Sequence, residues 1–575
     1  MILFNPKRYD RWHADERSKE IVLKTIAFFE DKGLRKIKAD DEGRVWYEDF
    51  LAFIRQEHIF AALLTPAGYG APESRWDMWR ISEYSEVLAF YGLHYWYAWQ
   101  VSILGLGPIW MGSNEDMKHE AARLLAEGGI FAFGLSEREH GSDLYATEMM
   151  LLPQEDGGFL ARGEKYYIGN ANKAPLISTF GKVQGTGEFA FFAVRTGHGG
   201  YECVRRINTS GMRPAYVAHC KLTDYPVAPE DLISRGPLAW ESALNTVNVG
   251  KFGLGFASIG ICTHALYEAM GHAGSRVLYG RPVTDFSNVR TLLTEAFTRL
   301  IAMKLCGMRA VDYLRCASED DRRYLLFNPI AKMKVTAQGI KVMDLLHEVM
   351  AARGFEQDTY FEMAIRDIGM PPRLEGAERI NLALIIKFMS GYFFAHQDYP
   401  EVPRRADPAN DGYLFRQHTG GLSKIQFPDY RKCYEGVNIP SVLVFREQVE
   451  LFKEFLIKIP PTKKQAADID YMLGVGQLFT VIVYAQLILE NAKIYKIDDD
   501  LVNEIFKFMI KDFDGSVLSM VASFDNTHEQ EALFMKMIKK PILERQRSNR
   551  VWERHVSTLK DQYVTGEKED GREHA

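Results

Sequence analysis

The spacing of apolar residues along the chain changes from a helical period to a strand period and back again. Apolar positions recur every three to four residues over about residues 16–130, as in Glu20–Phe29 and Glu48–Phe60, which predicts amphipathic helices. Short apolar runs separated by glycine- and aspartate-rich turns follow, and they predict a small β domain between about residues 131 and 235. The clearest predicted strands begin at Phe131, Lys165 and Glu188.

Helices are predicted again beyond this β domain. Long amphipathic stretches at Ala257–Met270 and Val289–Leu314 belong to a helical part that ends near residue 394. Residues 395–440 are rich in proline, glycine, aspartate and arginine, which predicts a linker or a functional loop. A further helical block then extends to about residue 560.

The chain is therefore predicted to be mainly α-helical with a central β domain. We expect five parts, which are an N-terminal helical domain (1–130), a β domain (131–236), a helical bundle (237–394), a connection (395–440) and an additional C-terminal helical region (441–575).

Composition places the chain among ordinary globular proteins. Hydrophobic residues make up 47% and charged residues 25%, which excludes a disordered, collagen-like or wholly transmembrane chain. The 70 basic and 76 acidic side chains give a net charge of −6, so overall charge provides no attraction to nucleic acid or anionic lipid. The six cysteines form no CxxC pair, which favours buried thiols in a reducing compartment. The N-terminus turns charged after a short apolar start and does not look like a secretory signal, so we expect a cytoplasmic protein.

Two long uncharged stretches raise the question of a membrane. Val87–Asn114 (with His94 neutral) and Tyr471–Leu489 reach the length of about 20 residues that spans a bilayer. Glycines and side-chain amides interrupt both stretches. We therefore expect buried helices at both places.

Four short motifs suggest chemistry, and each also has an ordinary structural explanation. Gly250–Gly255 lacks the third glycine of a dinucleotide-binding loop and follows no clear strand, so close helix packing explains it better. The basic segment Lys536–Arg554 could bind nucleic acid or an anionic membrane, but a solvated helix face is the simpler interpretation. The turn from His140 to Asp143 offers backbone N–H groups and a hydroxyl to a cofactor phosphate, but taken alone an ordinary turn is the simpler interpretation. Glu375 follows a Pro-Pro turn, which can direct its carboxylate into a pocket, but taken alone a glutamate in a surface loop is the simpler interpretation.

These signals occur in an order that resembles the acyl-CoA dehydrogenase family of flavoproteins over about residues 16–394. Leu135–Asp143 is similar to the family's T-E-x-x-x-G-S-D loop, and Gly163–Asn170 is similar to its G-x-K-x-W-I-T-N strand. The remaining motifs are Asp224–Leu232 for D-V-x-V-P, Ser275–Pro282 for E-R-x-x-F-G-x-P, Arg366–Asp367 for R-D, and Leu374–Ala377 for the E-G-T loop. The resemblance implies a helical domain, a β domain and a four-helix bundle, followed here by the additional helical region.

The resemblance also implies FAD as the cofactor, Glu375 as the catalytic base and no metal. The implied flavin-binding residues are Phe133, Gly134, Leu135, Ser136, Gly141, Ser142, Tyr167, Ile168, Gly169, Arg276, Leu278, Ser287, Met350, Ala351, Ala352, Ala377 and Arg379. The implied substrate-binding residues are Ser142, Asn248, Lys251, Glu375 and Gly376. Some family members carry the base on an earlier helix, at the position of Gly250 here, so Glu375 has no evident rival.

Individual roles follow from the same resemblance. Tyr167 would replace a tryptophan that contacts the isoalloxazine, and Arg276 would bind the flavin pyrophosphate across a subunit interface. Met350–Ala352 would meet the adenine end of the flavin of the neighbouring subunit. Aromatic residues of Val87–Asn114 would either line the acyl pocket or pack in the core; they are Tyr91, Tyr95, Trp96, Tyr97 and Trp99.

Several positions depart from the family pattern. Glycine at 169 replaces a threonine near flavin N5, Ser287 replaces a glutamine, Ala351–Ala352 replaces a Gly-Gly pair, Lys251 replaces an arginine, and Ala377 replaces the threonine after the base. Arg373 and Arg379 flank Glu375 and, if close to it, would lower its pKa.

The implied reaction is the α,β-dehydrogenation of an acyl-CoA to a trans-2-enoyl-CoA, as in fatty-acid β-oxidation. Glu375 removes the α-proton, the β-hydride goes to flavin N5, and the electrons pass to an electron-transfer flavoprotein. We expect a homodimer or homotetramer. The alternatives are an acyl-CoA oxidase that uses O₂, a flavin-containing nucleic-acid binder and a non-catalytic member of the fold. The additional helical region could cover the bundle, form an interface or touch a membrane.

Overall fold

The computed structural model describes residues 2–418 and 420–563, which form two compact units. We call them the β unit, whose described residues are 9–261, 406–418 and 420, and the bundle unit, whose described residues are 2–8, 262–405 and 421–563. The boundary falls within one long helix, α7 (Gly236–Ser275). The five parts expected from the sequence stay a prediction.

The β unit begins with the helices α1 (Glu16–Glu42), α2 (Glu48–Gln56), α3 (Ile59–Leu64), α4 (Met78–Tyr91), α5 (Leu93–Met111) and α6 (Glu115–Ala126). Short polar side chains cap the start of α1, α4 and α6. Asp77 accepts hydrogen bonds from backbone N–H groups at the start of α4, and Asn114 does so at the start of α6. The sequence pattern did not predict the kink in α1 at Gly33, where φ is 72°.

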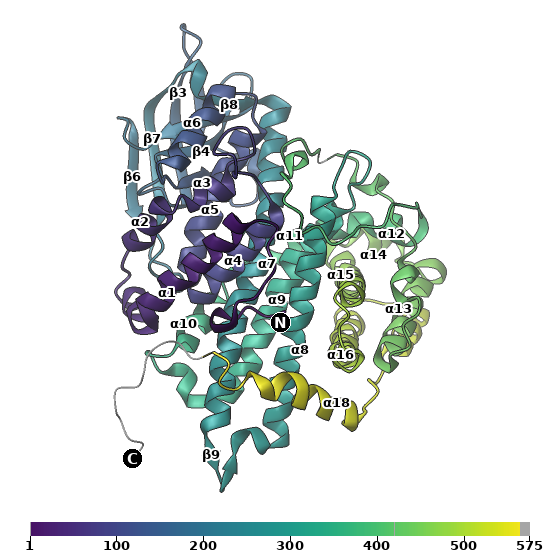
Figure 1. The fold of residues 1–575 in the computed structure, drawn as a ribbon. Helices are drawn as coiled ribbons and strands as arrows, with labels where there is room; N and C mark the ends of the chain where they lie inside the picture. The colour runs from purple at the N-terminus through teal and green to yellow at the C-terminus, as the bar shows by residue number, and fades with distance from the viewer. Residues whose placement is uncertain (1, 419, 564–575) are drawn as a thin grey trace. The chain divides into compact units, whose positions relative to one another are not determined.

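The predicted β domain is confirmed as one sheet (Figure 1). Its strands are β1 (Phe131–Gly134), β2 (Met150–Pro153), β3 (Phe159–Gly169), β4 (Leu176–Val183), β5 (Phe189–Arg195), β6 (Tyr201–Arg206), β7 (Val217–Val227) and β8 (Leu232–Arg235). The strand order is β6-β7-β3-β2-β4-β5-β8, and β1 pairs in parallel with β4. Side chains from one face form the core of this sheet, among them Ala161, Ile168 and Phe192.

The bundle unit contains the second half of α7 and the remaining helices. They are α8 (Ser287–Arg315), α9 (Tyr324–Met350), α10 (Tyr360–Asp367), α11 (Glu378–Ile385), α12 (Met389–Phe394), α13 (Pro440–Lys458), α14 (Lys463–Ala467), α15 (Ile469–Ile494), α16 (Asp499–Ser523), α17 (His528–Met537) and α18 (Arg545–Val551). A two-stranded hairpin, β9 (Val277–Leu278) and β10 (Arg281–Pro282), precedes α8.

The additional C-terminal region is helical as predicted, and it is part of the bundle unit. Helices α15 and α16 pack against α8, and α15 also packs against α9 (Figure 1). Asp512 of α16 is buried and lies 3.1 Å from Arg299 of α8 and 2.9 Å from Lys341 of α9. These ion pairs tie the additional helices to the bundle. Residues 564–575 of the predicted region lie outside the described residues.

Two helices are long and apolar enough to span a membrane by length and composition, namely α7 and α15. Their most apolar windows are 100% and 83% buried. The uncharged stretch Tyr471–Leu489 lies in α15, whereas most of Val87–Asn114 forms the end of α4 and the whole of α5. Both stretches are largely buried helices, as the sequence predicted.

Candidate active site

A bulge near the end of β3 exposes Tyr167. The register of β3 against β7 shifts between Tyr166 and Ile168, and Tyr167 has a φ of 64°. Its side chain is 60% exposed, whereas Ile168 is buried in the sheet core, so only the backbone of Ile168 can meet a ligand on the exposed side. Tyr166 N–H donates to the Ser136 carbonyl over 2.9 Å, and Ser136 Oγ donates to the Tyr166 carbonyl over 2.7 Å. The structure therefore brings Ser136 beside Tyr167.

Glu137 holds both ends of the loop that contains Gly141 and Ser142. Its buried carboxylate accepts hydrogen bonds from the Thr147 hydroxyl and from the Glu148 N–H, and Lys165 Nζ lies 2.8 Å away. Burial raises the pKa of Glu137, but the charge and hydrogen bonds of Lys165 outweigh burial and hold this pKa below its ordinary value. Burial lowers the pKa of Lys165 to about 8, and Glu137 opposes that shift. The sequence analysis did not predict this pair, since the two residues lie far apart in the chain.

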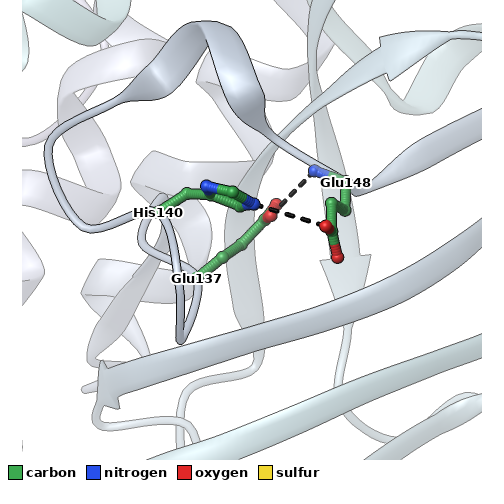
Figure 2. Close-up of side chains that lie close together, drawn as sticks. All are labelled: Glu137, His140 and Glu148. Atoms are coloured by element: carbon green, nitrogen blue, oxygen red, sulfur yellow. Dashed lines mark hydrogen bonds and ion pairs between the residues drawn. The ribbon is translucent and has the colours of Figure 1, made fainter.

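Three side chains at this loop come close enough to suggest a metal ion. Figure 2 shows Glu137, His140 and Glu148, and one ligand atom from each lies within 4.8 Å of the others. His140 Nε2 lies 3.3 Å from a Glu148 carboxylate oxygen. The carboxylate of Glu137, however, already faces the ammonium group of Lys165. The positive charge of Lys165, 2.8 Å away, would repel a metal cation at this place. Glu137 therefore serves to tie the loop to β3 through its ion pair with Lys165.

Side chains of α5 fill the space beside Gly169 that a larger residue would need. A Cβ atom on Gly169 would lie 2.7 Å from the Tyr97 ring and 2.8 Å from its hydroxyl, and Val101 lies equally close. The other aromatic residues of this stretch are 0–2% exposed and pack in the core; they are Tyr91, Tyr95, Trp96 and Trp99. Core packing is thus confirmed for these four, and Tyr97 lies against a predicted site residue, Gly169.

The glycine-rich segment of α7 packs against α5, which confirms the packing interpretation. Gln100 Nε2 donates to the Gly250 carbonyl over 2.8 Å, and a Cβ atom on Gly253 would lie 2.1 Å from Gln100 Oε1. The predicted substrate-binding residues Asn248 and Lys251 lie on this part of α7, and each is 7% exposed.

Part of the predicted connection lies against the same helix. The carbonyl of Gln417 accepts a hydrogen bond of 2.6 Å from Asn245 Nδ2, and its side chain lies 3.5 Å from Asn248 Nδ2. At the other end of the segment, Asn410 and Asp411 accept backbone N–H groups of Trp76 and Met78. Composition predicted only a loop here, but residues 406–418 are a fixed part of the β unit beside a predicted substrate-binding residue.

In the bundle unit, Glu375 lies in a short loop with an unusual backbone. Glu375 and Gly376 have φ values of 51° and 90°, between the short helix Pro371–Arg373 and α11. Lys332 Nζ of α9 donates to the carbonyls of Pro372 (2.8 Å) and Gly376 (2.5 Å), one on each side of Glu375. A left-handed conformation at a glutamate costs free energy and persists where neighbouring contacts fix it.

A second side chain holds the same loop from its other end. Asn381 Nδ2 of α11 donates to the Gly376 carbonyl over 2.9 Å and to the Ala377 carbonyl over 3.1 Å. Sequence reasoning missed both Lys332 and Asn381. Lys332 lies about forty residues before the loop in a helical pattern that looks like ordinary bundle core.

The two arginines that flank Glu375 make their contacts elsewhere. Arg373 donates to the Gly369 carbonyl over 2.5 Å, and Arg379 forms an ion pair of 2.8 Å with Asp470 in α15. Neither contact involves the Glu375 carboxylate. These contacts therefore do not support the expectation that the two arginines lower the pKa of Glu375. Arg379 thus connects the loop after Glu375 to the additional C-terminal region, and its predicted contact with the cofactor stays a prediction.

The remaining predicted cofactor residues lie at exposed places of the bundle unit. Arg276, Leu278 and Ser287 surround the β9–β10 hairpin, whose tip, Tyr279, is 95% exposed. Met350 is the exception, because its side chain is fully buried, and its contact with a flavin stays a prediction. Ala351 and Ala352 are exposed, and Ala351 has φ 51° and ψ −132°, a conformation that suits glycine.

The predicted site residues thus divide between the two units. The β unit holds Phe133, Gly134, Leu135, Ser136, Gly141, Ser142, Tyr167, Ile168, Gly169, Asn248 and Lys251. The bundle unit holds Arg276, Leu278, Ser287, Met350, Ala351, Ala352, Glu375, Gly376, Ala377 and Arg379.

Comparison with known proteins gives consistent matches. The family model for the acyl-CoA dehydrogenase middle domain matches residues 132–225, and that for the acyl-CoA dehydrogenase C-terminal domain matches residues 240–390. The short-chain specific acyl-CoA dehydrogenase of Megasphaera elsdenii is 22% identical over 48% of this chain and 72% of its own length. A 3-sulfinopropanoyl-CoA desulfinase of Cupriavidus necator is 28% identical over 46% of this chain and 68% of its own length.

Solved structures extend the likeness to the additional helices. An acyl-CoA dehydrogenase of Bacillus anthracis, complexed with FAD, covers 97% of both chains with a TM-score of 0.75 and 17% identity. The butyryl-CoA dehydrogenase of Megasphaera elsdenii covers 65% of this chain and 98% of its own, with a TM-score of 0.60 and 18% identity. The fold of nearly the whole chain therefore has a solved counterpart. The matches show that residues 132–225 and 240–390 belong to the acyl-CoA dehydrogenase middle and C-terminal domains.

Proposed function

We propose that the protein is an FAD-dependent acyl-CoA dehydrogenase in which Glu375 removes the α-proton of an acyl-CoA thioester. The main support is the loop of Glu375, whose left-handed backbone is held on both sides by hydrogen bonds from Lys332 and Asn381. Family membership alone does not fix the reaction, since a desulfinase and a 3-(aryl)acrylate reductase are among the similar proteins.

The residues of the β unit fit a flavin. Tyr167 presents a large, mostly exposed aromatic ring beside the clamped backbone of Ser136, and Gly141 and Ser142 lie exposed on a loop that Glu137 anchors. When bound, FAD would accept a hydride from the substrate β-carbon. Tyr167 would pack on its ring system, and the Tyr97 hydroxyl beside Gly169 would supply a polar contact where the family's threonine is missing.

Glu375 would act as the general base. A base must lie within hydrogen-bond reach of the proton it removes, and small displacements from that position slow the reaction. The Lys332 and Asn381 hydrogen bonds fix the backbone of Glu375 before substrate arrives, so its placement costs little when the reaction begins. The backbone N–H of Glu375 would donate to the thioester carbonyl and stabilise the negative charge that develops on it.

The substrate side would be formed by Ser142, Asn248 and Lys251 together with the fixed segment 406–418. Because Gln417 lies against Asn248, this segment would limit the space for the acyl-CoA. Tyr91, Tyr95, Trp96 and Trp99 pack in the core, so an aromatic wall built from all five aromatic residues is not part of the proposal. We further propose an electron-transfer flavoprotein as the electron acceptor, a homo-oligomer that uses the exposed hairpin with Arg276, and a cytoplasmic location.

The first test is to purify the protein with FAD, record its visible spectrum and titrate a panel of acyl-CoAs without oxygen. Bleaching of the flavin by one thioester supports dehydrogenation and identifies the acyl class. Glu375→Gln should retain the flavin and the substrate complex but lose bleaching. A flavin that no thioester bleaches would refute the proposed reaction, and oxygen consumption during turnover would indicate an oxidase.

A further inference from the structure

Two of the six cysteines lie directly opposite each other in the sheet of the β unit. Cys203 of the edge strand β6 pairs with Cys220 of β7 in the antiparallel register. Both face the sheet core, where Cys220 is 5% exposed and Cys203 packs against it from the partly buried edge. Neither residue belongs to the proposed active site, and both are present as free thiols.

The hydrogen-bond pattern places the pair where side chains approach most closely. Thr223 N–H donates to the Gly200 carbonyl over 2.9 Å, so residues 200 and 223 form a hydrogen-bonded pair. Pair types alternate along an antiparallel ladder, which makes Cys203 and Cys220 a non-hydrogen-bonded pair. The Cα atoms of such a pair lie about 4.5 Å apart, inside the range of about 4.4–6.8 Å that a disulfide requires.

The surroundings make the two thiols chemically unequal. Tyr201 Oη lies 3.4 Å from Cys220 Sγ, and Cys203 Sγ lies 3.7 Å from Tyr216 Oη. A hydrogen bond from the Cys220 thiol holds the pKa of Cys203 below its ordinary value despite partial burial. The same contact, together with burial, raises the pKa of Cys220. The directions of these two shifts favour Cys203 over Cys220 as the thiolate that reacts first.

We propose that Cys203 and Cys220 form a reversible disulfide when the protein meets a hydroperoxide. The Cys203 thiolate attacks the peroxide oxygen, which gives a sulfenic acid and releases water after protonation. The sulfur of Cys220 then displaces the hydroxyl group, forms the S–S bond and loses its proton, which leaves as part of a second water. Two thiols and one hydrogen peroxide thus become one disulfide and two waters.

The strand arrangement allows this bond to form. Strand β6 is paired on one side only, and a register shift between Cys203 and Arg205 interrupts its ladder directly after the cysteine. An edge strand with a bulge can adjust its position more easily than a central strand. The bridge would tie the edge strand to β7, which is paired along its length with β3, the strand that carries Lys165 and Tyr167.

The test uses the reduced full-length protein, exposed to hydrogen peroxide, blocked with iodoacetamide and digested with trypsin without reductant. We expect mass spectrometry to find peptide Thr196–Arg205 linked to peptide Ile207–Lys221, and dithiothreitol to separate the two. Cys220→Ser should abolish the link and let a sulfenic acid accumulate on Cys203. The matched control, Cys316→Ser, removes another half-buried cysteine and should leave the link unchanged.

A second measurement needs no variant. Iodoacetamide at pH 7 should modify Cys203 faster than Cys316, because burial raises the pKa of the Cys316 thiol. The proposal is refuted if peroxide oxidises Cys316 while Cys203 and Cys220 stay unlinked, or if Cys203 is alkylated more slowly than Cys316. Both outcomes can occur whether or not the protein dehydrogenates acyl-CoA, so they do not depend on Glu375.

Discussion

The contact between Lys332 and the loop of Glu375 gives the most direct test of how the base is positioned. Replacing Lys332 by methionine keeps most of the side-chain volume and removes the ammonium that bridges the Pro372 and Gly376 carbonyls. The loop would then lose both of these hydrogen bonds while keeping those from Asn381, and Glu375 would spend less time in its strained, left-handed conformation.

The size of the effect follows from these hydrogen bonds. A hydrogen bond to a charged group contributes about 1.5–3 kcal/mol net. If the loss of Lys332 weakens the positioning of Glu375 by that amount, proton removal should slow about 10- to 100-fold, since about 1.4 kcal/mol corresponds to a factor of ten. The total stability should change less, because the variant no longer has to bury a charge.

The assay is the anaerobic rate at which the best acyl-CoA of the panel bleaches the flavin, measured by stopped flow. Lys334→Met is the matched control, because Lys334 is a buried lysine on the same helix whose Nζ lies 3.6 Å from Asp512 instead of the loop. It should lower the melting temperature without slowing the bleaching. The reasoning fails if Lys332→Met bleaches at the wild-type rate, or if both variants slow equally.

Three further changes test other parts of the structure. Ala351→Gly should raise the free energy of unfolding in urea by about 0.5–2 kcal/mol, because glycine relieves the positive φ; Ala352→Gly, which lacks that φ, should bring no gain. Gly169→Ala should lower the free energy of unfolding by about 1–3 kcal/mol, because the added methyl group overpacks against Tyr97. It should also weaken FAD binding, measured by fluorescence quenching. The control is Gly141→Ala, where the added atom meets nothing, and an equal effect of that variant would contradict this reasoning.

The third change concerns pH. Burial raises the pKa of Asp512, but the charges of Lys334, Arg299 and Lys341 outweigh it and hold this pKa far below its ordinary value. Because this pKa is lower in the folded than in the unfolded protein, the ionised carboxylate stabilises the fold above the unfolded pKa of about 4. This stabilisation is lost progressively as the pH falls below that value. Asp512→Asn should therefore lower the melting temperature at pH 7, and its melting temperature should fall less than that of the wild type between pH 5 and pH 3. If the melting temperatures of the variant and the wild type fall equally between pH 5 and pH 3, Asp512 is not the group that stabilises the fold in this way.

The sequence predicted the parts of this fold that depend on local spacing. The change from a helical to a strand period located the sheet of residues 131–235, because side chains repeat every 3.6 residues in a helix and every two in a strand. It also indicated that Gly250–Gly255 is a packing segment, since a glycine motif without a preceding strand lacks the context of a phosphate loop. The kink at Gly33 was missed because one helix-breaking residue barely changes the apolar pattern.

The sequence indicated individual residues of the candidate site, but it did not indicate which residues contact one another. The motif order indicated Glu375, Tyr167 and Ser136, and the structure shows why the last two lie together. The burial of Met350 and Ile168 could not be read from a motif, because a motif fixes the backbone position and not the face on which a side chain lies. The same limit applied to the role of residues 406–418.

The sequence alone thus determined the order of the helical and strand parts, and its motifs pointed to the acyl-CoA dehydrogenase family and to Glu375 as the base. Tertiary structure decided which distant residues hold the loop of Glu375 and which thiols face each other. Lys332 meets the loop of Glu375, and Tyr97 fills the space beside Gly169, only because packed helices and strands bring these residues together. Cys203 and Cys220 are opposite each other only through the register of β6 and β7. Local spacing fixes secondary structure, but such contacts depend on the packing of whole elements.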